Sequence, residues 1–253
     1  MGTTFERDDA VAVITIDRPA RRNAVDMETA RELDRRFVEF EQDPTLRIAV
    51  MTGAGGTFCA GADLKALAEG EDAGARLGMD ATGPMGPTRR TLVKPVIAAI
   101  EGHAVAGGLE LACWCDLRVA ARDAVFGVHC RRVGVPLVDG GTVRLPRLIG
   151  QSRAMDLILT GREVSAEEAG EMGLVNRVCA PGQALETAVA LAAEIAAHPQ
   201  TCLRGDRLSV LAQWSLSEAE ALVEETRRGR ETLDSGEPLA GARRFTGGGT
   251  EQA

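Results

Sequence analysis

Alternation of short apolar runs with helical patterns is the feature that most constrains the fold of this chain. The runs are rich in β-branched residues, and they predict strands at 11–16 (VAVITI), 47–52 (RIAVMT), 96–100, 116–120 and 125–126. Helices are predicted between them, over 26–41, after the turn at 58–65, over 107–115 and from 140 to about 173. Strands separated by crossover helices pair in parallel, so the sequence predicts an α/β fold.

The last quarter of the chain has helical patterns only. Helices are predicted over 184–197, 201–213 and 217–233, and Ser217 with Glu220 forms a capping-box pattern at the start of the third. The tail after Phe245 is expected to fray. Weak periodicity between about 70 and 91 predicts either a substrate-adaptable loop or a long connector.

Composition excludes several classes of protein. The 253 residues carry 29 basic and 37 acidic side chains, a net charge of −8, which disfavours nucleic acid as a partner. No basic segment followed by an apolar stretch opens the sequence and no run reaches about 18 apolar residues, so we expect a cytoplasmic protein without a membrane span. Six scattered cysteines and three histidines predict neither a disulfide scaffold nor a metal site.

Two strand-turn-helix units suggest how the chain does chemistry with so few histidines and no tyrosine. Small residues fill both turns, at 53–62 and at 102–108, and each turn offers backbone N–H groups at the start of a helix. Two such groups that converge from different turns form an oxyanion hole for a carbonyl developing negative charge. Neither turn matches a nucleotide-phosphate motif, and no G-x-S-x-G hydrolase motif occurs.

Glu110 is the first candidate catalytic residue. It lies three residues beyond Gly107 in an apolar helix start, AGGLELA, where burial would raise the pKa of its carboxyl group toward that of a working acid or base. The alternative interpretation is a structural ion pair with an arginine such as Arg118.

Several motifs in register resemble the enoyl-CoA hydratase, or crotonase, superfamily from about residue 11 to 180. They are RPxxxNA (18–24), FCAGADLK (58–65), KPVIAAIEG (94–102), AGGLELA (106–112), CDLR (115–118) and FG (126–127). The resemblance implies a spiral of ββα units over 1–195, which binds acyl-CoA and carries out catalysis. It also implies a C-terminal helical region over 196–253 for oligomerisation, as a homotrimer or dimer of trimers.

The resemblance also implies roles for individual residues. The backbone amides of Ala62 and Gly107 would hold the thioester oxygen. Arg22, Ala24, Asp63, Leu64 and Lys65, together with Ala62, would bind coenzyme A, which is part of the substrate, so no separate cofactor is expected. Arg243 and Arg244 would approach a coenzyme A phosphate of a neighbouring subunit.

The chain departs from the family pattern at its second acid. Hydratases of the family use two glutamates, of which the first corresponds to Glu110, whereas Cys130 stands at the place of the second. A thiol is a poor substitute for a carboxylate at neutral pH, so a packing role is predicted for Cys130. Activation by His129 is not expected if the segment is extended, because adjacent side chains then point in opposite directions.

Asp139 offers a replacement acid nine residues further on. Its setting before Gly140-Gly141-Thr142 is similar to that of the base in dienoyl-CoA isomerases, and an N-cap role for the following helix is the alternative. The resulting hypothesis is a thioester-enolate enzyme with Glu110 as the principal acid–base group. Hydration of a 2-enoyl-CoA is the first expectation, isomerisation by Glu110 and Asp139 the second, and a catalytically degenerate acyl-CoA-binding protein the third.

Overall fold

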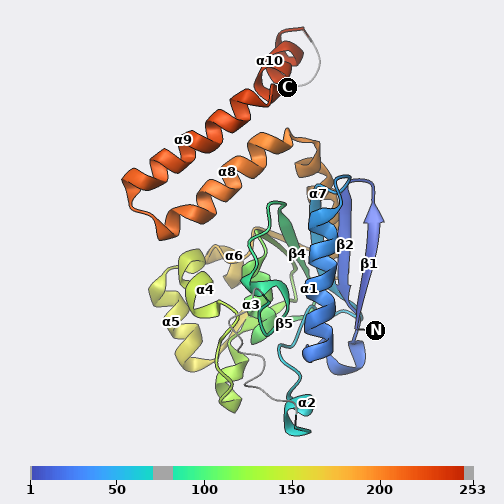
Figure 1. Cartoon of the computed structure of the whole chain (residues 1–253). Helices are drawn as coiled ribbons and strands as arrows, with labels where there is room; N and C mark the ends of the chain where they lie inside the picture. Colours follow the sequence, from blue (N-terminus) through green and yellow to red (C-terminus); the bar gives the residue numbers. More distant parts are fainter. Residues whose placement is uncertain (1, 71–81, 248–253) are drawn as a thin grey trace. The chain divides into compact units, whose positions relative to one another are not determined.

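The computed structural model describes residues 2–70 and 82–247 (Figure 1). Residues 71–81 of the stretch predicted to be a loop or connector, and the tail beyond residue 247, lie outside the described residues. The chain divides into two compact units, Met1–Ala193 and Glu194–Ala253. This division lies close to the expected boundary between core and oligomerisation region, and the roles assigned to the two parts stay predictions.

A six-stranded sheet forms the centre of the first unit. Its strands lie in the order β1-β2-β3-β4-β6-β9, and all neighbours are parallel except the edge pair β1 and β2. Their bounds are Thr3–Asp8, Val11–Ile16, Ile48–Gly53, Val96–Ile100, Leu117–Ala121 and Arg177–Cys179. The predicted parallel pairing is therefore found in the interior of the sheet, while the outer strands β1 and β9 were not predicted.

A smaller sheet supports the segments that lead to the functional site. It contains β5 (His103–Val105), β7 (Val125–Gly127) and β8 (Glu163–Ser165) in that order. β5 pairs with β7 in parallel, and β7 pairs with β8 in an antiparallel register. β8 interrupts the region predicted to be helical from 140 to 173.

Helices cover the sheets where the sequence predicted them. α1 begins after Asp26, whose side chain accepts a hydrogen bond from the backbone of Thr29, and it packs against β1 and β2 through buried residues such as Phe37 (Figure 1). The helices of this unit are α1 (Met27–Gln42), α2 (Leu64–Ala68), α3 (Gly107–Trp114), α4 (Gly141–Ile149), α5 (Gln151–Thr160) and α6 (Ala166–Glu171). α7 (Ala184–Ala197) runs through the division between the units.

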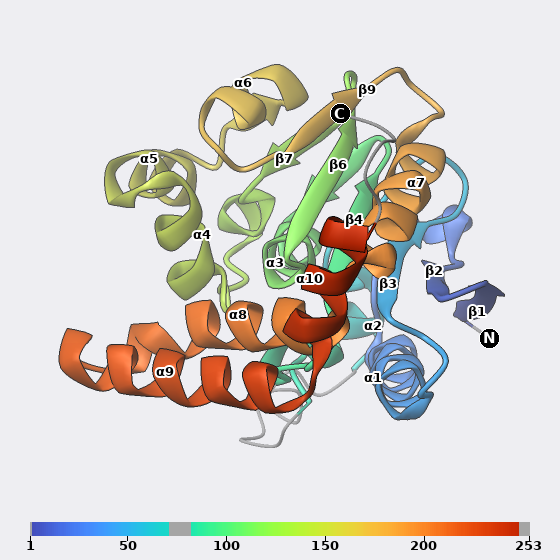
Figure 2. The same ribbon diagram turned by 90° about the horizontal axis from the view of Figure 1, so that it is seen from above.

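The second unit is helical. α8 (Gln200–Ala212) and α9 (Glu218–Asp234) lie side by side in both ribbon views, and α10 (Glu237–Gly247) follows (Figures 1 and 2). The predicted capping box is present, since the Ser217 hydroxyl accepts from the Glu220 backbone and the Glu220 carboxylate accepts from that of Ser217. The expected fraying after Phe245 is wrong as far as residue 247, where α10 ends.

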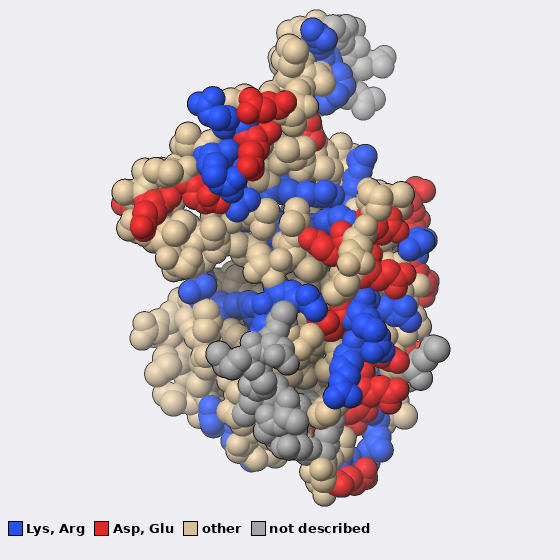
Figure 3. All heavy atoms as spheres, viewed as in Figure 1, with Lys and Arg blue, Asp and Glu red and all other residues tan. Residues whose placement is uncertain are grey.

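Charged side chains of both signs alternate over α1 and α9 (Figure 3). Pairs such as Arg36 with Glu39 and Arg227 with Glu231 account for part of this pattern. Within the described ranges, no helix is both long enough and apolar enough to cross a membrane.

Candidate active site

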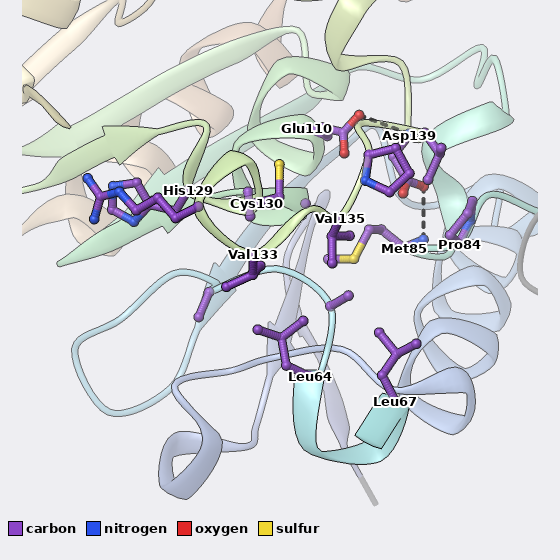
Figure 4. Close-up of a pocket in the computed structure, with 17 residues that line it drawn as sticks. Leu64, Leu67, Pro84, Met85, Glu110, His129, Cys130, Val133, Val135 and Asp139 are labelled. Carbon is purple, nitrogen blue, oxygen red and sulfur yellow. Dashed lines mark hydrogen bonds between the residues drawn. The ribbon is translucent and has the colours of Figure 1, made fainter. Parts of the chain in front are cut away.

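An apolar cavity of about 330 Å³ lies in the first unit, where the two glycine turns meet (Figure 4). Glu110, Cys130 and Asp139 lie along one side of this cavity, with Leu64 and Leu67 across from them. The lining residues are Ala60, Ala62, Leu64, Leu67, Pro84, Met85, Ala106, Gly107, Glu110, His129, Cys130, Arg132, Val133, Val135, Pro136, Val138 and Asp139. Two carboxyl groups in an otherwise mostly apolar cavity are typical of an acid–base site.

The two turns approach each other closely at Gly61 and Gly107. A side chain at Gly61, whose φ is +97°, would place its Cβ only 2.9 Å from the Gly107 nitrogen, so glycine is required there. Among the residues that the structure describes, the N–H groups of Ala62 and Gly107 donate no hydrogen bond. Both residues line the cavity, so two free amide donors from different turns face one space.

Ala106, which precedes Gly107, adopts a left-handed backbone conformation with φ 52° and ψ −126°. Such a conformation is strained for a residue with a Cβ and persists only where the surroundings impose it. The Ala106 N–H donates to the Gly127 carbonyl oxygen at 2.9 Å, and its own carbonyl accepts from Leu109. These bonds fix the orientation of the next peptide, which carries the Gly107 donor.

Glu110 is anchored by backbone amides and not by an arginine. Its Oε1 accepts hydrogen bonds from the backbone N–H groups of Asp139 and Gly141, at 2.9 and 2.8 Å. The ion pair with Arg118 is absent, because that guanidinium donates to backbone carbonyls, including those of Ala112 and Leu174. The structural alternative for Glu110 is therefore wrong.

The environment of Glu110 suits proton transfer. The pKa of its carboxyl group is raised from 4.5 to about 7, because burial, the largest cause, and the nearby charge of Asp139 together outweigh the opposing backbone hydrogen bonds. An acid with a pKa near the working pH gives and accepts a proton readily. Glu110 lines the cavity, so its carboxyl group is placed to exchange a proton with a ligand there.

Asp139 is held by Met85 and by Thr88 of the 3₁₀ helix Pro87–Arg89, and not by the helix that follows it. Its Oδ1 accepts from the Met85 backbone N–H at 2.9 Å and from the Thr88 hydroxyl. Gly140 is the N-cap of α4, and no side chain caps that helix, so the N-cap interpretation of Asp139 is wrong. Burial raises the pKa of Asp139, while the bonds from Thr88 and Met85 lower it.

Cys130 and His129 lie in a 3₁₀ helix, His129–Val133, and not in an extended segment. Both residues line the cavity, and the condition on which opposite orientations were expected, an extended segment, is not met. Burial raises the pKa of the Cys130 thiol and the Glu110 charge adds to the effect, which keeps sulfur protonated at neutral pH. Burial lowers the pKa of His129.

The residues expected to bind coenzyme A cluster at the turn before α2. Ala62 and Leu64 line the cavity, and the side chains of Arg22 and Lys65 are exposed. Asp63 is buried: it caps α2 through the amides of Lys65 and Ala66, and it pairs with Arg18 at 3.0 Å. Its carboxylate thus positions the turn, whose backbone remains the part available to a ligand.

The remaining expected residues fall outside this cavity. Ala24 is half-buried beside the turn, where its carbonyl accepts a hydrogen bond from Arg18. Arg243 and Arg244 are exposed on α10. The roles assigned to all these residues stay predictions.

Sequence reasoning missed Met85, Thr88, Arg132 and Arg144. Thr88 bonds to Asp139 across 51 positions of sequence, and Arg144 donates to the carbonyl oxygens of Asp139 and Thr88 at 2.8 and 2.6 Å. No local pattern marks such long-range partners. Among the residues that the structure describes, no group of three or more His, Cys, Asp or Glu side chains is arranged to hold a metal ion.

Comparisons with known proteins agree with this geometry. Residues 6–246 match the family model described as enoyl-CoA hydratase/isomerase. The enoyl-CoA hydratase EchA19 of Mycobacterium tuberculosis is 37% identical over 95% of this chain and 91% of its own length. The carnitinyl-CoA dehydratase of Escherichia coli is 41% identical over 75% of this chain and 72% of its own. The mevalonyl-coenzyme A hydratase of Aspergillus fumigatus is 36% identical, with coverages of 83% and 78%.

Solved structures show the same fold. The crystal structure of the enoyl-CoA hydratase EchA1 from Mycobacterium marinum has a TM-score of 0.91 and 37% identity, and covers 97% of this chain and 95% of that one. The fold and the paired turns thus define a crotonase-type acyl-CoA enzyme. The chain belongs to the enoyl-CoA hydratase/isomerase family. The predicted α/β crotonase fold with C-terminal helices is confirmed, and so is the predicted class of enzyme.

Proposed function

We propose that the protein is an enoyl-CoA hydratase, which adds water across the C2=C3 bond of a 2-enoyl-CoA. The observation that carries the proposal is the arrangement of one cavity with two free backbone amides, from Ala62 and Gly107, opposite a carboxyl group of pKa about 7 at Glu110. Thioester enolate chemistry needs both elements.

The reaction proceeds in two proton transfers. The thioester oxygen accepts hydrogen bonds from the two amides, and a carboxylate in the cavity takes a proton from water as the water oxygen bonds to C3. The C2=C3 π electrons move toward the thioester oxygen, giving an enolate that the amides stabilise. A carboxylic acid in the cavity then protonates C2, which restores the carbonyl and gives the 3-hydroxyacyl-CoA.

Hydration is preferred over isomerisation because of the relatives. Three of them are named for water addition or removal: the enoyl-CoA and mevalonyl-CoA hydratases and the carnitinyl-CoA dehydratase. Isomerisation is the second candidate, favoured by Cys130. A protonated thiol at the place of the second acid removes a group that helps activate water, whereas moving a proton between C2 and C4 needs only acids such as Glu110 and Asp139.

Turnover assays separate these two reactions. The purified protein is incubated with crotonyl-CoA and, separately, with a 3-enoyl-CoA, and the products are resolved by chromatography and mass spectrometry. Formation of 3-hydroxybutyryl-CoA supports hydration, whereas conversion of the 3-enoyl to the 2-enoyl thioester without water addition supports isomerisation. Acyl-CoA binding without turnover of either thioester contradicts both proposals.

We also propose a cytoplasmic homotrimer, or a dimer of trimers, assembled through the C-terminal helices. Exposed apolar side chains on α8 and α9, including Val210, Leu222, Val223 and Leu233, support an interface on this unit. Light scattering after size exclusion measures the mass. A monomer at micromolar concentration would contradict this assembly.

A further inference from the structure

A buried hydrogen-bond network surrounds Asp139. Thr88 and Asp139 are 1% and 3% exposed, and the Thr88 hydroxyl donates to Oδ1 of Asp139. The Met85 backbone N–H donates to the same oxygen at 2.9 Å. Arg144 closes the network by donating to the main-chain carbonyls of Asp139 and Thr88.

The network leaves one oxygen of Asp139 available. Oδ2 has no partner among the described residues and is not sealed from solvent, and Asp139 lines the cavity (Figure 4). Gly83 lies on the same side as the Thr88 hydroxyl, because a Cβ on Gly83 would overlap the Thr88 hydroxyl oxygen and would sit 2.7 Å from Oδ1 of Asp139. Backbone therefore covers Oδ1, which leaves Oδ2 for the cavity that Glu110 and Asp139 both line.

We propose that Thr88 is the positioning residue of a two-carboxyl acid–base pair, fixing Asp139 through Oδ1 so that Oδ2 faces the substrate beside Glu110. This inference rests on the proposed function, since it assigns the second acid of the same cavity. Glu110 then carries the proton of the pair, and Asp139 is the base.

The charges around Asp139 determine which carboxyl group of the pair is ionised and which carries the proton. Arg89 and Arg144 favour the ionised form of Asp139, as do the hydrogen bonds from Thr88 and Met85. The Asp139 charge in turn raises the pKa of Glu110, and also that of the buried Cys59 thiol. Burial still raises the pKa of Asp139 overall, and these groups limit that rise, whereas the Asp139 charge adds to the rise at Glu110. Asp139 is therefore the group of the pair that loses its proton first.

The test compares Thr88→Val, which removes the hydroxyl at nearly constant shape, with Thr88→Ser, which retains it. Thr52→Val is the matched control, because Thr52 is also buried and its hydroxyl donates to a backbone carbonyl, that of Ala99 at 3.0 Å, away from the cavity. Turnover of crotonyl-CoA is measured from pH 5 to 10 for each variant, and binding of a saturated acyl-CoA by calorimetry.

For Thr88→Val we expect kcat to fall by about ten- to a hundredfold, as for loss of a hydrogen bond to a charged group, with binding retained. The pH profile should also narrow on its acid side. The lower limb moves up because the pKa of Asp139 rises without the Thr88 hydrogen bond, whereas the upper limb stays in place because Asp139 is ionised there and still raises the pKa of Glu110. Thr88→Ser should restore the wild-type profile.

Two results would overturn the inference. One is a Thr88→Val profile of unchanged width, or one that matches Thr52→Val. The other is a crystal structure of Thr88→Val in which the Asp139 carboxyl group has not moved, a measurement that does not depend on turnover. If the wild-type protein shows no turnover, the proposed function is contradicted. The positioning role of Thr88 is then decided by the crystal structures of wild type and Thr88→Val.

Discussion

Replacement of Glu110 by glutamine removes proton transfer at the site and little else. The glutamine carbonyl oxygen can accept the hydrogen bonds that Asp139 and Gly141 now donate to Oε1, so the local backbone should keep its position. The amide nitrogen takes the place of Oε2 at the cavity, where it cannot accept a proton. The lost step is therefore general acid–base catalysis, which contributes about two to four orders of magnitude in rate, or roughly 3 to 5 kcal/mol in the activation free energy.

The assay follows loss of the conjugated enoyl thioester of crotonyl-CoA, with Kd for a saturated acyl-CoA measured in parallel. Glu101→Gln is a matched control, because the Glu101 carboxylate also accepts two backbone N–H bonds, from Gly182 and Ala184, but does not line the cavity. We expect Glu110→Gln to lose about a hundredfold or more in kcat with Kd nearly unchanged, and Glu101→Gln to keep its rate. Equal rates for Glu110→Gln and wild type would refute the assignment of Glu110 as the acid–base group.

Three further predictions concern stability and the thiol. The pKa of Glu110 in the folded protein is raised from 4.5 to about 7. The free energy of unfolding therefore includes a contribution that is fully present below pH 4.5 and is lost, by up to about 3 kcal/mol, as the pH rises through 7. In urea unfolding at pH 4, 6 and 8, Glu110→Gln should not show this loss. The same pH dependence of the free energy of unfolding in both proteins would contradict the burial argument. Cys130→Ser should change kcat by less than about threefold, because the buried thiol stays protonated; a hundredfold loss would make Cys130 catalytic. Arg118→Met should cost at least about 3 kcal/mol by thermal unfolding, since four backbone carbonyls lose a charged donor, and an unchanged Tm would be inconsistent with this account.

Local patterns were sufficient to predict the elements that carry the site. α1 begins at its Asp26 cap, and β2, β3 and β4 are buried apolar runs, so each has a strong signal within its own residues. β1 was missed because its sequence, TTFERD, is polar and lies mostly at partial or full exposure on the sheet edge. Short strands such as β5 and β8 depend on partners distant in sequence, which a local pattern does not contain.

The site was predicted only in part, because local sequence patterns mark some of its residues and long-range contacts position the others. The glycine turns and Glu110 stood out by composition, and the structure brings them to one cavity. The orientation of Asp139 follows from Thr88, 51 positions away, and the partners of Glu110 are the backbone amides of Asp139 and Gly141, so neither is encoded in adjacent residues. Long-range hydrogen bonds therefore decided the points on which sequence reasoning was wrong.

The close approach of Gly61 to Gly107 has a consequence for folding. The two amide donors come from segments more than forty positions apart, so neither turn forms the anion site until the sheet between them has assembled. Thioester recognition is then an all-or-none property of the first unit. Recovery of acyl-CoA binding during refolding should coincide with the final cooperative step, which makes ligand capture a reporter of correct chain assembly.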